Sequence, residues 1–422
     1  MLLQLPYGCG YLEYNFPANS AVLTSHIDSV ISNKAGIDLV RDAMDKPLNS
    51  PPLYELARDK RSAVIIISDH TRPVPSTDIL PNMLHDLRRD NPRIQITLLV
   101  ATGCHREMRN NELITKLGTT TCSREKIVVH DAYDSNGNIK IGELPSGAPL
   151  VIDKIGAECD LLVAEGFIEP HFFAGFSGGR KSVLPGICDS VTVMGNHCSD
   201  FIDNKYSRTG ILDNNLINID MEYAACLAKL AFIVNVVIDK SQKTIAAFAG
   251  DAIAAHRAGC EFLRKYCETT PRALSDIVIT TNGGAPLDQN VYQSVKGITA
   301  AEAAAKDGAV IIVCAECRDG IGGDNFYHQL SECTSPEELY SSFMNISREQ
   351  TSPDQWQSQI LARIMMKHDV IFVTREELRK KITNMKMKYA ATIEEAMRLA
   401  YEIKGTKASI TVIPNGVSVI VR

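Results

Sequence analysis

The stretch AVIIISDHTRP, residues 63–73, decides the fold. It opens with an uninterrupted apolar run, Ala63–Ile67, and changes at Ser68 to polar and turn-forming residues. An apolar run without alternating polar residues is typical of a strand buried on both faces of a parallel sheet. The polar residues follow directly where such a strand would end. This stretch therefore predicts a buried strand that delivers polar side chains to one edge of a sheet.

Apolar runs of the same kind recur along the chain and alternate with amphipathic stretches. Further strands are predicted at Ile96–Val100, Lys126–His130, Asp160–Ala164, Ala231–Val237, Asp276–Thr280, Ala309–Val313 and Asp369–Val373. Helical patterns lie at Thr77–Arg89, Thr299–Lys306 and Thr392–Ile403. This alternation predicts an α/β fold with mainly parallel sheets.

A chain of 422 residues is too long for one simple core, so two domains are expected. The boundary is predicted at Thr269–Pro271, after a long helix over Ala252–Tyr266 and before a new strand–helix series. The predicted domains are residues 1–270 and residues 271–422, both α/β, with the active site in the cleft between them. Near the C-terminus, Ser409–Ile413 and Val417–Val421 look like a closing hairpin.

Composition and charge exclude several classes of partner. The net charge is −6 and the basic residues are scattered, so neither a nucleic acid nor an anionic membrane is expected to bind. No run of about 18 apolar residues predicts a membrane span, and the first residues do not resemble a secretory signal. Among twelve dispersed cysteines, Cys314 and Cys317 have the two-residue gap of a zinc site, but one such pair is weak support. Reduced thiols in a cytoplasmic protein are the simpler interpretation.

Polar and glycine-rich segments follow directly on several predicted strands. Asp69 to Arg72 follow the first strand, Gly103 to Arg106 follow the second, and the segment containing His171 follows Asp160–Ala164. Asn282-Gly283-Gly284 follows a strand of the second domain. Ligands of open α/β sheets bind outside the carboxyl ends of the strands. The sequence therefore predicts an enzyme whose site residues converge on one crevice.

The richest segment is EPHFFAGFSGGRK, residues 169–181. Its glycines, Gly178 and Gly179 among them, allow close approach of the backbone to a ligand, and Arg180 and Lys181 add positive charge. A phosphate or another anion is the expected occupant, although the segment matches neither common phosphate-binding motif. The alternative is a flexible glycine loop without a ligand.

Two residues of this region are candidates for covalent and metal chemistry. Lys181 precedes an apolar segment, where a partly desolvated lysine is a plausible nucleophile or covalent anchor. His197 follows a short helical stretch and is a candidate metal ligand. The sequence has no HExxH motif and no Cys/His quartet, so a transition metal would need further donors from a cofactor.

Among the other histidines, His105 and His171 are the functional candidates because each follows the end of a predicted strand. His130, at the end of another strand, is ambiguous. Surface positions are expected for the histidines in polar or helical surroundings, namely His26, His85, His256, His328 and His368.

Taken in order, these motifs resemble the nickel-dependent lactate racemase family. The resemblance covers most of the chain: residues 68–73, 103–106, 169–186 and 195–197 are followed by 283–297 and by the single tryptophan, Trp356. It implies two domains, the first of them cofactor-binding, and a racemase or epimerase that inverts C2 of lactate or a related 2-hydroxy acid. It also implies a nickel-pincer nucleotide, a pyridinium mononucleotide with thioamide and thiocarboxylate arms, which accepts hydride and passes through a 2-keto acid.

The resemblance also implies roles for individual residues. Lys181 matches the lysine that tethers the cofactor, His197 matches a nickel ligand, and His105 and His171 match the two acid/base residues. The cofactor phosphate is expected near Ser177, Gly178 and Gly179. Asp69, Arg72 and Trp356 match positions around the cofactor or substrate. Arg72 and Lys296 match residues that bind the substrate carboxylate, and Tyr292 and Gln293 match residues that orient it.

Two other functions remain possible from the residues alone. One is a zinc-dependent lyase or hydrolase that uses His105, His171 and His197 as ligands. The other is a non-catalytic binder of an organic acid or nucleotide. The sequence indicates neither the particular 2-hydroxy acid nor the oligomeric state.

Overall fold

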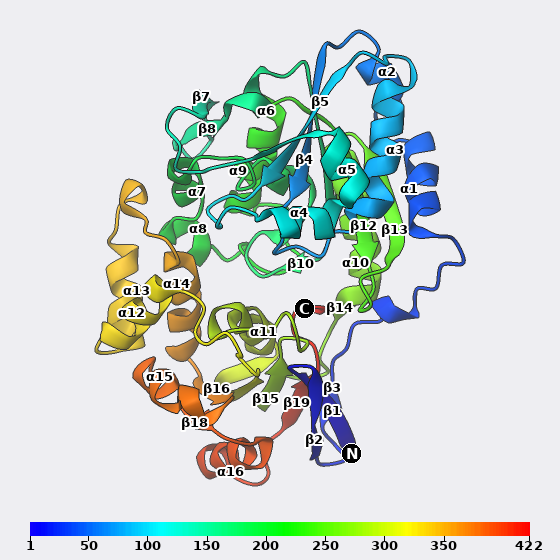
Figure 1. Cartoon of the computed structure of the whole chain (residues 1–422). Coiled ribbons are helices and arrows are strands. Elements are labelled where there is room, and N and C mark those ends of the chain that lie inside the picture. The colour runs from blue at the N-terminus through cyan, green and yellow to red at the C-terminus, as the bar shows by residue number, and fades with distance from the viewer.

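The computed structural model describes all 422 residues and contains two α/β lobes, each built around a six-stranded sheet (Figure 1). The predicted fold class is confirmed, and a strand occurs at each of the eight predicted places. None of the helices is both long and apolar enough to cross a lipid bilayer.

The sheet of the first lobe has the strand order β13-β12-β9-β4-β5-β6 and is parallel except for the β12–β13 pair. Both faces of β4 are covered, because Val64 and Ile66 belong to one hydrophobic cluster while Ile65 and Ile67 belong to another. This explains the uninterrupted apolar run that predicted the strand. The strands are β4 (Ser62–Ser68), β5 (Gln95–Ala101), β6 (Lys126–Val129), β9 (Leu161–Phe167), β12 (Leu230–Ile238) and β13 (Thr244–Gly250).

Helices cover the two faces of this first sheet. One face packs against α1 (Gly36–Asp45), α2 (Leu53–Ala57) and α3 (Ser76–Arg89). The opposite face packs against α9 (Leu216–Leu227), and α10 (Ala254–Cys267) lies along β12 and β13. The lobe also contains α4 (Asn110–Leu117), α5 (Thr119–Arg124), α6 (Lys154–Glu158), α7 (Ser190–Asn196), α8 (Ser199–Asp203) and the hairpins β7 (Asn138–Glu143)–β8 (Pro149–Asp153) and β10 (Pro170–His171)–β11 (Gly175–Phe176).

The sheet of the second lobe has the order β18-β17-β16-β15-β19-β3 and is parallel throughout. Its strands are β15 (Ser275–Thr281), β16 (Ala305–Cys314), β17 (Asp369–Val373), β18 (Lys388–Ala390), β19 (Ile410–Ile413) and β3 (Ala21–Val22). Its helices are α11 (Val291–Ala303), α12 (Asp324–Glu332), α13 (Pro336–Met344), α14 (Gln355–Met365), α15 (Arg379–Asn384) and α16 (Ile393–Lys404).

The structure differs from the sequence prediction at three places. Residues 1–22 lie with the second lobe, although the expected first domain includes them: β3 pairs with β19, and the hairpin β1 (Leu2–Tyr7)–β2 (Gly10–Asn15) packs on the second sheet. The predicted C-terminal hairpin is wrong, because β20 (Ile420–Val421) pairs in parallel with β14 (Glu268–Thr269) of the first lobe. The helix predicted at Thr299–Lys306 begins earlier, at Val291, and ends at Ala303, since β16 starts at Ala305.

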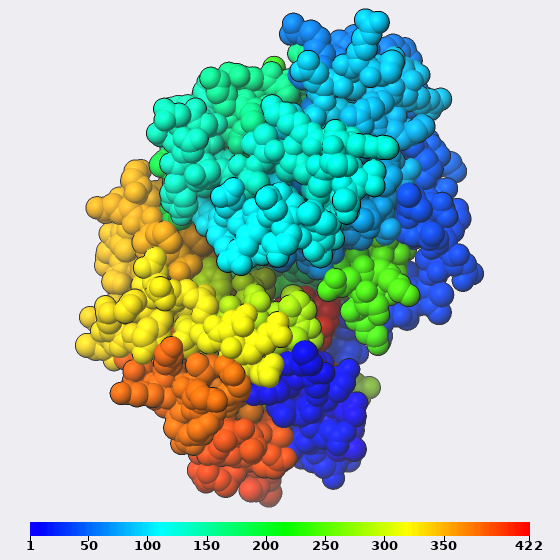
Figure 2. Space-filling model, in the orientation of Figure 1, coloured from blue at the N-terminus to red at the C-terminus, as the bar shows by residue number.

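Strand order places the loops that carry polar residues at one position in each lobe. In the first sheet β5 and β6 lie on one side of β4, whereas the later strands β9, β12 and β13 lie on the other. In the second sheet β16 and β19 flank β15 in the same way. Ligands of open α/β sheets bind at such switch points. A pocket lined by both lobes lies between these loops, and Figure 2 shows the groove between the lobes.

Candidate active site

Asp69 and His105 form a hydrogen-bonded pair at the carboxyl ends of β4 and β5. The Nδ1 of His105 lies 2.8 Å from Oδ2 of Asp69. The other oxygen, Oδ1, accepts from the backbone N–H of Thr71 at 3.1 Å and from its hydroxyl at 2.6 Å. Burial opposes the charge on Asp69, but these hydrogen bonds and the nearby Arg72 outweigh it and lower the pKa of Asp69 to about 2.

This pair fixes the orientation of the His105 ring. Because Asp69 is a carboxylate and can only accept, Nδ1 of His105 carries the proton that it donates. Nε2 is then an acceptor. The side chain of His105 is 47% exposed, whereas that of Asp69 is 2% exposed. The His105 ring is therefore held through Nδ1 by Asp69, and its Nε2 is free to accept a proton from a ligand.

His171 lies in the small hairpin β10–β11 and is held in the opposite way. The backbone N–H of Ala174 donates to its Nδ1 at 3.2 Å, so in the neutral ring the proton is on Nε2. Phe172 stacks on the ring at 5.1 Å between centroids, and Phe173 meets it edge-on at 4.5 Å. Burial, and then the charges of Lys181, Lys296 and Arg72, hold the pKa of His171 well below its usual range.

Three basic side chains, Lys181, Lys296 and Arg72, gather around His171 with little compensating negative charge. Burial, followed by the charges of Arg180, Arg72 and Lys296, holds the pKa of Lys181 well below that of an ordinary lysine. Burial and Arg72 lower the pKa of Lys296 to about 8. Glu169 is the one acid that opposes these shifts at either lysine. Such an excess of positive charge fits one or more anionic ligands.

His197 follows α7 and is 4% exposed. Its Nδ1 lies 3.1 Å from the carbonyl oxygen of Val193, so Nδ1–H donates there and the lone pair of Nε2 is free. Burial and the charge of Lys181 lower the pKa of His197 to about 3, which keeps the ring neutral. A neutral imidazole oriented through its second nitrogen is the form that binds a metal. The donor chemistry of His197 therefore fits a single metal ligand.

The second lobe brings Trp356, Tyr292 and Lys296 to the same region. Trp356, at the start of α14, meets the His197 ring edge-on at 5.0 Å between centroids. Tyr292 packs against Phe326 at 5.3 Å, and burial together with the nearby Asp354 raises its pKa. The side chain of Gln293, on the same helix α11, forms no hydrogen bond within the protein. Lys296 lines the pocket between the lobes together with His171.

The glycine loop differs from the anion cradle that the sequence predicted. The Ser177 hydroxyl accepts from Glu169 N–H at 2.9 Å and donates to the Phe167 carbonyl at 3.0 Å. Gly179 N–H donates to Oδ1 of Asn235 at 2.7 Å, and a Cβ at Gly178 would lie 2.7 Å from the same oxygen. Close packing within the protein thus explains both glycines.

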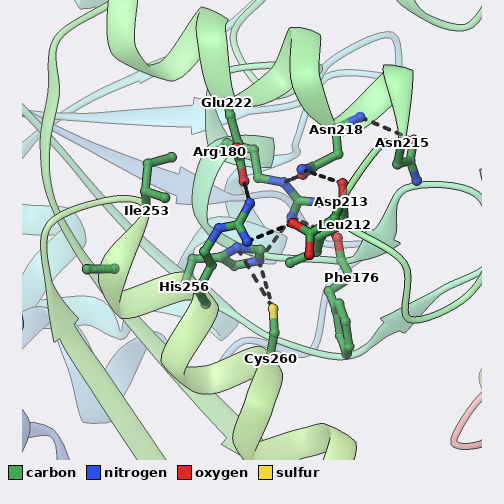
Figure 3. Close-up of polar contacts among 12 residues, drawn as sticks. Phe176, Arg180, Leu212, Asp213, Asn215, Asn218, Glu222, Ile253, His256 and Cys260 are labelled. Carbon is green, nitrogen blue, oxygen red and sulfur yellow. Dashed lines mark hydrogen bonds and ion pairs between the residues drawn. The ribbon is translucent and has the colours of Figure 1, made fainter. Parts of the chain in front are cut away.

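The expected anion-binding role of Arg180 is wrong. Its guanidinium is fully buried and binds backbone carbonyls and the side chains of Asn218 and His256 (Figure 3). His256 is therefore buried rather than on the surface, and the surface prediction for His368 is also wrong, since it is 7% exposed.

Two ionisable residues beneath the site, Glu165 and Lys116, were not predicted from the sequence. Glu165 is 3% exposed, and its Oε1 accepts from the Ser76 hydroxyl at 2.7 Å. Nζ of Lys116 donates to the carbonyl oxygen of Arg72 at 3.1 Å. Lys116 thus supports the loop that carries Asp69 and Arg72, and Glu165 holds the start of α3, which follows that loop. A lone carboxylate inside an apolar strand was the available signal for Glu165, whereas no sequence pattern marks Lys116.

Histidine, cysteine and acidic side chains form no group of three or more that could hold a metal ion. The zinc-dependent alternative required His105, His171 and His197 to be such a group. The geometry therefore does not support that alternative.

Comparison with known proteins agrees with this arrangement. Family profiles described as the lactate racemase N-terminal domain and the lactate racemase C-terminal domain match residues 7–210 and 270–421. The chain is 48% identical over 422 residues to a lactate racemase of Thermoanaerobacterium thermosaccharolyticum, covering 100% of this chain and 99% of that protein. It is 51% identical over 385 residues to a lactate racemase of Lactiplantibacillus plantarum, covering 91% of each protein.

Solved structures give the same result at the level of the fold. The lactate racemase apoprotein of Thermoanaerobacterium thermosaccharolyticum superposes with a TM-score of 0.97 over 100% of both chains, at 48% identity. A Thermotoga maritima protein shares the fold alone, with a TM-score of 0.66 at 17% identity over 91% of this chain and 98% of that one. The resemblance inferred from the motifs is thereby confirmed: the chain belongs to the lactate racemase family of isomerases.

Proposed function

We propose that this chain is a lactate racemase that interconverts the two enantiomers of lactate at C2. The observation that carries the proposal is a pair of histidines with opposite hydrogen bonding at Nδ1: His105 follows β5 and His171 follows β9, on either side of β4, beside a cluster of basic residues. Inversion needs a proton acceptor and a proton donor for the C2 oxygen, and histidine suits both roles near neutral pH. The names of the curated relatives support lactate as the substrate.

The substrate carboxylate would bind to Arg72 and Lys296. Arg72 influences the pKa of both His171 and Lys296, so the three groups lie within electrostatic reach of one another. A guanidinium can bind a carboxylate with two parallel hydrogen bonds, and Lys296 adds a second charge. Tyr292 and Gln293, from the same helix as Lys296, would orient the bound acid.

The two histidines would act on the C2 oxygen from different starting states. Nε2 of His105 is an acceptor and would take the hydroxyl proton, after which Asp69 stabilises the charged ring. Nε2 of His171 starts as a donor. Complete proton transfer by His171 needs a proton on Nδ1, which must then release the Ala174 N–H. Binding of an anion among the surrounding cations would favour that proton.

The residues present fit the nickel-pincer nucleotide that this family uses. His197 offers one free Nε2, and Lys181 offers an amine whose pKa burial and neighbouring cations hold well below that of an ordinary lysine. Lys181 would hold the group covalently, His197 would bind its nickel, and Trp356 and Asp69 would lie beside it. The backbone of the turn that carries Lys181 would be held in place by Ser177, Gly178 and Gly179. When bound, the group would supply a reversible acceptor for hydride from C2, and loss of the hydroxyl proton together with that hydride would give a planar 2-keto acid.

The test is racemisation of each lactate enantiomer by cofactor-loaded protein, followed by chiral chromatography. His105→Gln and His171→Gln should each lower kcat by about 100-fold or more, the usual worth of a positioned acid or base. The control is His85→Gln, because that side chain is 69% exposed and lies outside the site. Wild-type rates in both site variants would refute the proposed acid/base pair.

We further propose that the protein is cytoplasmic. Two of its free thiols, Cys9 and Cys226, are exposed to solvent. Exposed thiols stay reduced where glutathione and thioredoxin are present.

A further inference from the structure

The buried network around Arg180 has no part in the reaction as described above. The guanidinium is 0% exposed, and it lies directly beside Lys181 in the chain. Its donors reach the carbonyl oxygens of Ala174 at 2.7 Å and Phe176 at 2.8 Å, and Oδ1 of Asn218 at 2.7 Å (Figure 3). A fourth contact joins it to Nε2 of His256 at 3.0 Å.

These contacts hold one short loop from behind. The carbonyls of Ala174 and Phe176 belong to the turn after His171, and the Nη1 that donates to Phe176 also lies 3.2 Å from the Gly178 carbonyl oxygen. His256 also contacts the Ser177 carbonyl at 2.8 Å. Its ring lies so close to Gly179 that a Cβ there would be 2.6 Å from Cγ. One guanidinium and one imidazole thus fix the backbone over the whole Ala174–Gly179 segment.

The charge of Arg180 is satisfied by dipoles and not by a carboxylate. None of its hydrogen-bond partners is acidic. Glu222 binds instead to Arg257, at 3.2 Å, and Asp213 binds to the same guanidinium at 3.0 Å (Figure 3). A buried arginine without a counter-ion is costly, and retaining it calls for a reason beyond stability.

We propose that Arg180 is the positioning residue for Lys181: its contacts fix the Ala174–Gly179 backbone so that the lysine amine faces the cleft. Burial opposes a proton on that amine, and the positive charge of Arg180 acts in the same direction. The proposal deepens the proposed function, since it explains how the tether lysine becomes reactive. Lys181 and Arg180 point to opposite sides of the short 3-10 turn Gly179–Ser182, one toward the Phe173 ring at 5.7 Å and the other into the network.

The sign of the electrostatic effect follows from the surrounding charges. Arg180, Arg72 and Lys296 all oppose a proton on Lys181, and Glu169 alone favours it. Removing the positive charge at residue 180 would therefore raise the pKa of Lys181. Lys296 serves as a reference, because Arg180 is not among the charges that shift its pKa and coupling to Lys181 would move that pKa in the opposite direction.

The experiment measures acetylation of individual lysines by an N-hydroxysuccinimide ester in the full-length protein produced without cofactor. The amine nitrogen attacks the ester carbonyl, N-hydroxysuccinimide leaves, and the ammonium proton goes to solvent. Peptide mass spectrometry gives the rates at Lys181 and Lys296 between pH 6 and pH 10. The variants are Arg180→Met, Arg180→Lys and the control Arg257→Met, which alters an arginine that is 41% exposed in its side chain.

Arg180→Met should move the pH midpoint at Lys181 upward by about one unit, the smaller end of the effect of a nearby like charge. At pH values below the wild-type midpoint, labelling of Lys181 then slows roughly tenfold, whereas labelling of Lys296 does not slow. Arg257→Met should leave both lysines unchanged, and Arg180→Lys should restore part of the Lys181 rate. If Arg180→Met does not fold, Arg180→Lys carries the test, with Lys181 labelled more slowly than in the wild type.

Wild-type midpoint and rate at Lys181 in the residue-180 variants would overturn the proposal. Equal changes at Lys181 and Lys296 would also overturn it, because they would indicate general loosening. Labelling needs no cofactor, so failure to form the adduct in loaded enzyme would refute the proposed function and leave this result standing.

Discussion

Replacing Asp69 with asparagine tests the pairing that prepares His105. The carboxylate accepts Nδ1–H of His105 at 2.8 Å and is almost fully buried. An asparagine side chain can present its amide N–H instead, which would force the ring proton onto Nε2 and remove the acceptor that faces the substrate. We expect kcat for lactate racemisation to fall about 100-fold, as for other partners that orient a reacting histidine.

The same substitution has a consequence for stability. The pKa of Asp69 falls from 3.8 to about 2, which corresponds to about 2 kcal/mol of stabilisation. A lowered pKa stabilises the fold above pH 4, and this contribution is lost as the pH falls from 4 toward 2. Asp69→Asn should therefore lower the free energy of unfolding at pH 7 by about 1–2 kcal/mol, since its amide oxygen still accepts from Thr71, and should flatten the change between pH 4 and pH 2.

Chiral chromatography and urea unfolding at several pH values measure the two effects. Thr71→Val is the matched control, because it removes the hydroxyl contact with Asp69 at 2.6 Å and leaves the contact with His105. Activity of Asp69→Asn within about threefold of the wild type would refute the reasoning, since the wrong ring tautomer costs far more.

Three other substitutions have distinct expected outcomes. Lys296→Met should raise KM for lactate by about 30-fold with a smaller effect on kcat, because a charged hydrogen bond contributes about 2 kcal/mol. In the wild type, KM should increase at pH values above 8, because Lys296 has a pKa of about 8 and loses its proton there. Gly179→Ala places a Cβ 2.6 Å from the His256 ring at a φ of +54° and should destabilise the fold by about 2–4 kcal/mol in urea unfolding, against about 1 kcal/mol for Gly118→Ala, where φ is +80° and nothing lies within 4 Å. His197→Ala should retain the adduct on Lys181 and lose nickel, as measured by elemental mass spectrometry, and nickel content equal to the wild type would exclude His197 as a ligand.

The fold was predictable where one local pattern determines it. Strands such as β4 and β15 are buried on both faces, so an apolar run is their necessary sequence. The partner of a short strand has no such local cause. Val22 joins β19, nearly four hundred residues later, and Ile420 joins Glu268 and not the nearby β19. Only the packing of the two lobes determines those pairings.

The candidate site was predictable as a set of residues at strand ends, but the direction and contacts of each side chain were not. Asp69 and His105 directly follow the ends of β4 and β5, and His171 follows β9, as their positions after predicted strands indicated. The direction in which a side chain points is a tertiary property: Arg180 and Lys181 are adjacent, yet one faces the protein interior. Three glycines beside two basic residues suggested an anion cradle, whereas contacts with distant side chains account for Gly178 and Gly179.

In the mechanism that we propose, racemisation depends on a nickel-bearing organic group held by Lys181 and His197. The most direct test is intact-mass spectrometry under denaturing conditions, with nickel analysis, on protein produced together with a nickel-pincer cofactor pathway. We expect a covalent mass increase in the wild type that is absent from Lys181→Ala, and about one nickel ion for each adduct. Unmodified protein, with neither nickel nor a noncovalently bound cofactor in native mass spectrometry, would contradict it.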